Sequence, residues 1–261
     1  MILITQQRVG TAHGEILAMQ IAARELGWDV LTAPSGWRLD ESLIQSGVKG
    51  VPYGSQTFCE VIAQQMNWTL KANPFDWLSK LHPYYLKRKV EFMTLGDAKK
   101  ITERKFIKPA DDKCFDAKVY DPGTFKPHDI IEDSYPVLVS DPVDFDLEYR
   151  TFVGPSHRKS DPSIRVRTWS NYIMYDHIAD PKYWNMVPSD EDRLPHDLVN
   201  DLLHDMEYHD MGSLITVPSV IDVGRIKGKG WAIIETNQAW ASGLYGCDPL
   251  QALKVLEQSC E

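Results

Sequence analysis

The first part of the chain predicts a β-α-β unit, and this feature restricts the possible folds more than any other. Residues 1–5 (MILIT) have the pattern of a short buried strand, and apolar residues recur at helical spacing from about His13 to Leu26. Gly27 is a natural helix stop, and residues 28–33 (WDVLTA) again have the pattern of a strand. Two strands connected through a helix favour a parallel sheet, so we expect the chain to start with a small α/β unit.

The segment that follows is predicted to contain turns and short helices. Residues 50–54 are rich in turn-forming residues, Ser55 is suited to be an N-cap, and residues 57–66 have helical periodicity. Two prolines then bracket a short aromatic helix predicted over 75–81. We therefore expect a domain boundary within about 67–83.

The second half is predicted to consist mainly of strands. Four segments have strand patterns, at 106–109, 135–140, 147–153 and 165–174. Pro195 opens a helix whose apolar residues share one face. Two further strands, 219–223 and 231–236, are predicted to be joined by a glycine-rich turn over 224–230. This order favours an α+β or mixed α/β lobe with an antiparallel sheet.

The charge and hydropathy of the chain argue against two classes of function. The 261 residues carry a net charge of −9 without a long basic run, so a general nucleic-acid-binding surface is not expected. No apolar stretch approaches the ~20 residues that cross a bilayer, and the N-terminus lacks the basic start of a signal peptide. The four cysteines form no CxxC pair and are interpreted as free thiols in a reducing compartment. We therefore expect a cytoplasmic protein without a membrane segment.

Three oxygen-bearing side chains near the end of the sequence give the strongest local signal. Glu235 and Asn237 are two apart on a predicted strand and therefore point to the same face, and Asp222 is expected at the end of the neighbouring strand. Hard oxygen ligands of this kind suit Mg²⁺ that also contacts substrate phosphates. The alternative is a surface hairpin with solvated polar residues, and the pattern alone does not decide between the two.

Basic residues on the predicted strands give weaker signals. Lys108 follows a buried strand (FIKP), where a lysine can reach a phosphate, although an exposed lysine at a strand end is the more common case. Arg150 shares a strand face with Glu148, and Arg165 and Arg167 repeat the spacing on the next strand, so the two strands could form a cationic floor. Cross-strand ion pairs with acidic residues are the alternative.

Together these motifs resemble the ATP-grasp superfamily over about residues 84–249, and within it a compact phage- and bacteria-associated branch known for characteristic arginines and a lysine. The most specific stretch is DVGRIKGKGWAIIETNQAWASGLYG. The resemblance implies an α/β (α+β) chain with the ATP-grasp fold, in which two α+β lobes grip ATP behind a small Rossmann-like β-α-β pre-domain. It implies a pre-domain over 1–75 and an ATP-grasp domain over 76–261, with a small lobe at about 84–138 and a large lobe at about 139–261.

The resemblance also implies roles in holding the metal and the phosphates. Asp222, Glu235 and Asn237 would hold one or two Mg²⁺ ions on the ATP phosphates, and Mn²⁺ could substitute. Lys108 resembles the phosphate-binding lysine, and Lys113 resembles the lysine of the short lid that follows. This lid has Ala-Asp-Asp where many members of the superfamily have glycines, which puts phosphate binding by backbone amides there in doubt.

The remaining implied roles concern the adenine and the reacting phosphate. Leu138 and Val139 lie on a strand that resembles the hinge between the lobes and would offer backbone groups to the adenine. Glu148 belongs to the same nucleotide-binding set. The implied contacts to the γ-phosphate or to an acyl phosphate come from four arginines, Arg150, Arg165, Arg167 and Arg225.

The activity implied by the resemblance is that of an ATP-dependent carboxylate–amine ligase. A small-molecule or peptide carboxylate would form an acyl phosphate with release of ADP, and an amine would displace phosphate to give an amide or peptide bond. A homodimer is a further expectation. Two alternatives stay open: an ATP-binding kinase-like or regulatory module, and a non-catalytic interaction protein that presents aromatic residues such as Trp184 and Trp240.

Overall fold

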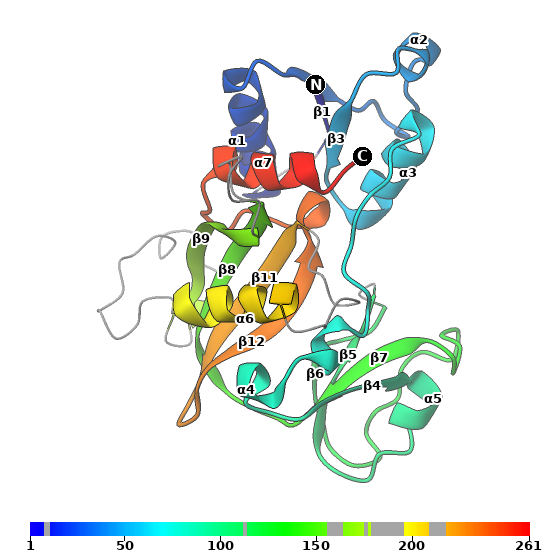
Figure 1. Cartoon of the computed structure of the whole chain (residues 1–261). Coiled ribbons are helices and arrows are strands. Elements are labelled where there is room, and N and C mark those ends of the chain that lie inside the picture. Colours follow the sequence, from blue (N-terminus) through cyan, green and yellow to red (C-terminus); the bar gives the residue numbers. More distant parts are fainter. Residues whose placement is uncertain (8–10, 112–113, 156–163, 175–176, 179–195, 209–217) are drawn as a thin grey trace.

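The computed structural model describes residues 1–7, 11–111, 114–155, 164–174, 177–178, 196–208 and 218–261. Within this part of the chain, three sheets follow one another along the molecule (Figure 1). We call the three parts the N-terminal unit (β1–β3 with α1–α3), the small lobe (β4–β7 with α5) and the large lobe (β8–β12 with α6). Mixed α/β architecture is therefore confirmed.

The N-terminal unit contains the predicted parallel sheet. Strand β1 lies between β2 and β3 and pairs with both in parallel. All four residues of β1 are buried, which explains why this strand is continuously apolar. Its elements are β1 (Ile2–Thr5), α1 (Thr11–Glu25), β2 (Asp29–Thr32), α2 (Glu41–Gln45), β3 (Gly50–Tyr53) and α3 (Gln56–Met66), which Ser55 caps as predicted.

The turn predicted over residues 50–54 is wrong, because most of this segment forms the buried strand β3. Gly50 is required by a close approach of two backbones, since a Cβ there would clash with the carbonyl oxygen of Ile2. Pro52 is tolerated because β3 is at the edge of the sheet in the described part of the chain, where one side needs no ladder hydrogen bonds. Glycine and proline here reflect strand packing and do not mark a turn.

The small lobe is a four-stranded antiparallel sheet with the order β4-β7-β5-β6. Its core is formed by Leu95, Ile107, Val137 and Val139, among others. Two short helices lead into it, the 3₁₀ helix η1 (Trp77–Lys80) and α4 (Pro83–Leu86). The lobe itself comprises β4 (Val90–Thr94), α5 (Leu95–Ala98), β5 (Lys105–Pro109), β6 (Lys118–Tyr120) and β7 (Pro136–Ser140).

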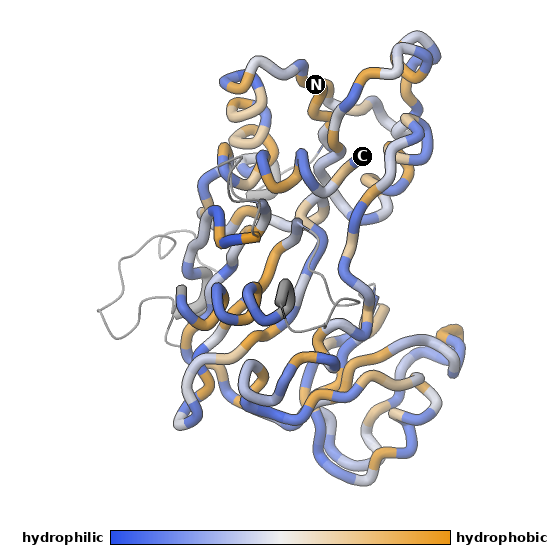
Figure 2. The backbone as a smooth tube through the Cα atoms, in the orientation of Figure 1, coloured by the Kyte–Doolittle hydropathy of each residue, from blue (hydrophilic) through white to orange (hydrophobic). Residues whose placement is uncertain are grey.

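The large lobe is a five-stranded antiparallel sheet with the order β10-β9-β8-β11-β12. Helix α6 contributes Leu198, Val199, Leu202 and Leu203 to the core beneath the sheet, and Figure 2 shows both hydropathy colours along this helix, as expected for one buried face. The elements are β8 (Phe145–Pro155), β9 (Ile164–Met174), β10 (His177–Ile178), α6 (His196–Tyr208), β11 (Ser219–Ile226), β12 (Gly230–Gln238) and the 3₁₀ helix η5 (Ala239–Ala241).

Two predictions about the β11–β12 hairpin need correction. The glycine-rich turn is shorter than predicted, because β11 continues to Ile226 and pairs there with Gly230. Asp222 is therefore not at a strand end but in the middle of β11, between β8 and β12, and its side chain is fully buried. An acidic residue in an apolar strand marks a strand end only when it has no buried partner, and Asp222 has one.

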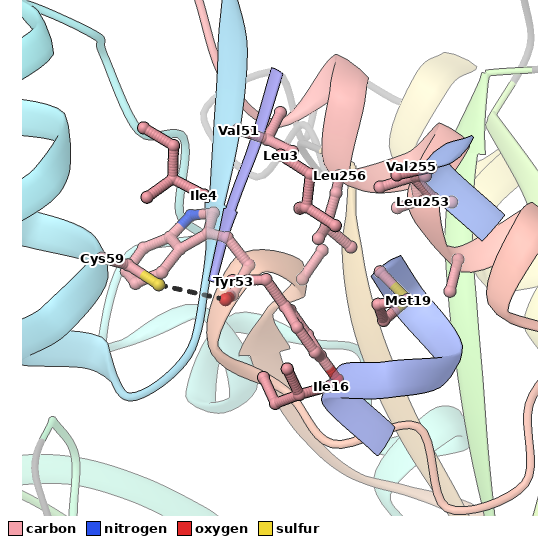
Figure 3. Packing of buried hydrophobic residues seen from close by; sticks show 14 of the residues in the cluster. Leu3, Ile4, Ile16, Met19, Val51, Tyr53, Cys59, Leu253, Val255 and Leu256 are labelled. Atoms are coloured by element: carbon pink, nitrogen blue, oxygen red, sulfur yellow. Dashed lines mark hydrogen bonds between the residues drawn. The ribbon is translucent and has the colours of Figure 1, made fainter. Parts of the chain in front are cut away.

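The last helix, α7 (Pro249–Gln258), packs against the N-terminal unit. Asp248 caps it by accepting from the backbone N–H of Leu250 and Gln251. Figure 3 shows Leu253, Val255 and Leu256 of α7 in one core with Leu3 of β1 and Met19 of α1. The predicted division into 1–75 and 76–261 stays a prediction, but the packing of the core crosses it.

Neither aromatic residue of the interaction-protein hypothesis offers an exposed surface in the described part of the chain. Trp240 is buried in the first core, and its indole N–H donates to the carbonyl oxygen of Lys71 at 3.0 Å. Trp184 lies outside the described residues. Among the described helices, none is both long and apolar enough to span a membrane.

Candidate functional site

A cavity of about 1180 Å³ opens where the three parts of the molecule meet. The N-terminal unit contributes Glu15 and Ser55, the small lobe Lys108, and the large lobe Arg150, Glu235 and Asn237. A second cavity of about 220 Å³ lies between the small and large lobes and has mainly apolar walls, formed by Leu78, Val90, Phe106, Leu138, Val143, Phe145 and Ile234. Lys108 and Glu235 border both cavities, so the two spaces adjoin.

The structure brings the three predicted metal ligands together. Asp222 is paired with Glu235 across β11 and β12, and the side chains of Glu235 and Asn237 share a face as predicted. The amide nitrogen Nδ2 of Asn237 lies 3.0 Å from Glu235 Oε1 and 3.4 Å from Asp222 Oδ2, so Asn237 bridges the two carboxylates.

Arg150 holds Asp222 through a two-pronged ion pair. Its Nε and Nη2 donate to the two oxygens of Asp222 at 3.0 and 2.7 Å. Burial raises the pKa of the Asp222 carboxyl, and the charge of Arg150 opposes this rise. Arg150 also donates from Nη1 to the carbonyl oxygen of Gly243 at 3.0 Å and lies 4.4 Å from the centre of the Tyr245 ring. The arginine therefore connects the sheet to the segment 243–245.

Lys108 links the two lobes through a salt bridge to Glu235. It belongs to β5 of the small lobe, whereas Glu235 belongs to β12 of the large lobe. Burial opposes ionisation of Glu235, but the charge of Lys108 and the hydrogen bonds from Asn237 and Lys108 outweigh it and lower the pKa of this carboxyl to about 2. Glu235 is therefore ionised at neutral pH and attracts cations into the cavity.

Arg88 is a residue of this site that the sequence patterns do not indicate. A β-bulge next to Asp222 leaves Ile234 without a partner on β11, and Arg88 donates to the carbonyl oxygens of Ile233 at 2.9 Å and Ile234 at 3.2 Å. Burial lowers the pKa of the Arg88 guanidinium to about 10. By satisfying the carbonyl groups at the bulge, Arg88 fixes the strand that carries Glu235. No strand or motif pattern surrounds it, so only the fold reveals its role.

Three of the predicted arginines lie away from both cavities. Antiparallel pairing sets Arg165 opposite Gly154, several residues along β8 from Arg150, and Arg165 is exposed. Arg167 donates to Gln251 on α7 at 2.9 Å, and Arg225 pairs with Asp146. The predicted cationic floor is therefore wrong, since strand register separates its members. Contacts of these three arginines with phosphate stay predictions that their positions do not support.

The predicted adenine contacts also change. Leu138 and Val139 pair with β4 on one side and with β5 on the other, so their backbone groups are already used within the sheet. The side chain of Leu138 borders both cavities, and Glu148 borders the smaller one. Lys113, the predicted lid lysine, lies outside the described residues. The nucleotide-binding prediction for Leu138 thus moves from its backbone to its side chain.

The donor set fits a magnesium ion held by few protein ligands. Glu235 and Asn237 line the larger cavity, whereas Asp222 lies behind them with both oxygens engaged by Arg150. Mg²⁺ usually binds one or two carboxylates together with substrate phosphates and water. No group of three or more histidine, cysteine or acidic residues suited to a metal occurs in the described part of the chain. Asp222 therefore fits as a charge that orients Asn237 and not as a direct ligand.

Comparisons with known proteins agree with this arrangement. The model of an ATP-grasp domain family, the second family of its clade, matches residues 85–255. No curated protein sequence matches the chain.

Solved structures share the fold at low sequence identity. D-cycloserine synthetase DcsG is similar over 98% of this chain and 99% of that chain, with 13% identity and a TM-score of 0.58. N5-carboxyaminoimidazole synthetase from Staphylococcus aureus, complexed with ADP, is similar over 98% of this chain and 77% of that one, with 9% identity and a TM-score of 0.56. The ATP-grasp ligase PsnB, complexed with precursor peptide PsnA2 and AMPPNP, covers 99% and 97% at 10% identity and a TM-score of 0.50. Likeness at this identity shows a common fold alone.

Proposed function

The chain belongs to this family of ATP-grasp domains, and from this premise we propose that it is an ATP- and Mg²⁺-dependent ligase that joins a carboxylate to an amine. The observation that carries the proposal is the connected set Lys108–Glu235–Asn237 on the wall of the large cavity, with Arg150 and Asp222 behind it. Two opposite charges from different lobes meet there, at the place where the two cavities adjoin.

The nucleotide is proposed to lie across both cavities. The adenine occupies the smaller, apolar cavity against Leu138 and Phe145, and the triphosphate extends past Lys108 and Glu235 into the larger one. Mg²⁺, or Mn²⁺ in its place, would be held by Glu235 and Asn237 and would neutralise charge on the phosphates. Structural neighbours complexed with ADP and with AMPPNP support a nucleotide between the two lobes.

The reaction then needs no nucleophile from the protein. A substrate carboxylate oxygen attacks the γ-phosphorus, and the bond from this phosphorus to the β–γ bridging oxygen breaks, which releases ADP and leaves an acyl phosphate. The neutral amine attacks the acyl carbon, phosphate departs, and the nitrogen loses a proton to give the amide. Lys108 and Arg150 contribute by positioning and by stabilising the charge of the transferred phosphoryl group.

Calorimetric titration tests the nucleotide site directly. AMPPNP is titrated with and without Mg²⁺ into the wild type, into Asn237→Ala and into the matched control Asn200→Ala, whose asparagine is exposed on α6. We expect Mg²⁺-dependent binding that is at least about tenfold weaker in Asn237→Ala, because one metal ligand is lost, and unchanged in the control. Absence of binding by the wild type would refute the proposal.

Product analysis tests the reaction class. ADP with a new amide supports the ligase, whereas ADP with a phosphoester would support the kinase-like alternative, which uses the same nucleotide site. Nucleotide binding without turnover on any acid–amine pair would favour a regulatory module.

A further inference from the structure

A carboxylate from the N-terminal unit faces the large cavity on the side away from the nucleotide. Glu15 of α1 lines this cavity but not the smaller one. Its Oε1 accepts from the backbone N–H of Tyr245 at 2.9 Å. The same segment, 243–245, is contacted by Arg150 through the carbonyl oxygen of Gly243 and the ring of Tyr245. A negative and a positive side chain therefore flank one short segment of the cavity wall.

The position of Glu15 is fixed by its surroundings. The next residue, Ile16, is buried in the first core beside Tyr53 (Figure 3). The hydroxyl group of Tyr53 donates to the carbonyl oxygen of Ser242 at 3.0 Å, which anchors the start of the segment. A Cβ at Gly243 would lie 3.0 Å from Glu15 Oε2, so glycine leaves space for the carboxylate. Tyr245 adopts a left-handed φ of 47°, a conformation that costs about 1 kcal/mol or more for a non-glycine residue.

The second oxygen of Glu15 has no cation among the described residues. The other charged groups of the cavity wall are already matched: Lys108 with Glu235, Arg150 with Asp222, Asp111 with Gln56, and Asp116 with Lys118. A half-buried carboxylate gains most from a hydrogen-bonded positive group. The cavity wall thus presents one negative charge, Glu15, that the described part of the protein leaves for a ligand.

From these contacts we propose that Glu15 binds the ammonium group of the acid substrate, and that this substrate is an α-amino acid. The proposal rests on the proposed function, because it names the carboxylate donor of that reaction. The ammonium group held by Glu15 is not the attacking amine, since a protonated nitrogen has no free electron pair for attack. The attacking amine must come from a second substrate.

The spacing of charges favours a short zwitterion. Arg150 stands on the phosphate side of the segment 243–245 and Glu15 on the other side, so a substrate carboxylate near Arg150 would place an α-ammonium group toward Glu15. The cavity of about 1180 Å³ exceeds the roughly 300–1,000 Å³ of a site for one small ligand, which leaves room for a nucleotide, an amino acid and the amine.

The test compares amino acids with their des-amino analogues. Release of ADP is measured with each common α-amino acid and with the analogue that has hydrogen in place of the ammonium group, such as alanine and propionate, in the presence of a panel of amines. The variants are Glu15→Gln, which keeps the acceptor for the Tyr245 N–H, and the control Glu25→Gln, an exposed glutamate on the same helix.

We expect the KM for the preferred amino acid to rise about 10- to 100-fold in Glu15→Gln, the effect of losing one hydrogen bond to a charged group. The KM for the des-amino acid and the Kd for AMPPNP with Mg²⁺ should not change. Equal use of both acids by the wild type, no use of any amino acid, or an unchanged KM in Glu15→Gln would overturn the inference. These results would leave nucleotide binding intact, whereas failure of the proposed function would abolish it.

Discussion

Replacing Arg150 by leucine should destabilise the fold strongly. Asp222 is fully buried, and Arg150 donates to both of its oxygens at 3.0 and 2.7 Å. Removing one partner of a buried ion pair leaves an uncompensated charge and costs about 3–5 kcal/mol. Because folded proteins are stable by only about 5–15 kcal/mol, this loss is a large fraction of the total.

Urea unfolding followed by tryptophan fluorescence measures the effect. With a slope of about 3 kcal/mol/M, a loss of about 3 kcal/mol lowers the midpoint by about 1 M. The converse variant, Asp222→Asn, should cost less, about 1–3 kcal/mol, because Arg150 borders the cavity and keeps its bond to the carbonyl oxygen of Gly243. A smaller loss for Arg150→Leu than for Asp222→Asn would refute the reasoning.

The pH dependence gives a second check on the same variant. Burial raises the pKa of Asp222, and without Arg150 the largest opposing charge is gone. A carboxyl whose pKa is higher in the folded than in the unfolded protein destabilises the fold above its folded pKa, and this penalty disappears as the pH falls toward the unfolded value of about 3.9. Arg150→Leu should therefore be closer in stability to the wild type at about pH 5 than at about pH 8. An equal difference at both values would contradict this.

Three further outcomes are expected. Leu253→Ala should cost about 2–5 kcal/mol in urea unfolding because this residue is fully buried; a loss below about 1 kcal/mol would contradict its place in the core. Gly224→Ala should weaken AMPPNP binding in calorimetry, because the new Cβ would lie 2.5 Å from Phe145 in the wall of the smaller cavity; unchanged affinity would argue against adenine there. Cys114 lines the larger cavity and is exposed, so AMPPNP with Mg²⁺ should slow its alkylation, which peptide mass spectrometry detects.

The elements with strong local patterns were predictable from the sequence. The parallel pairing of β1 and β2 follows from apolar and helical periodicity, and the shared face of Glu235 and Asn237 follows from strand alternation. Both depend on residues close together in the sequence. Strand β3 was missed because the reason for Gly50 is a contact with Ile2, which no local pattern contains.

The parts of the site that could not be predicted depend on strand register and on burial. Antiparallel pairing decides that Arg150 faces Asp222 whereas Arg167 reaches α7. Burial decides that Asp222 is paired within the sheet and that Arg88 satisfies the carbonyl groups of the bulge. A single sequence carries the alternation of side chains along a strand but not the offset between strands, so these contacts became visible only with the fold.

The return of α7 to the N-terminal unit has a consequence for synthesis on the ribosome. The core around Leu3 and Met19 is completed by Leu253 and Leu256, which are translated only after both lobes. The parallel sheet therefore waits with one apolar face uncovered while the rest of the chain emerges, a period in which chaperones would be expected to bind it. Closing this long loop late in translation makes the earliest part of the protein the last to become stable.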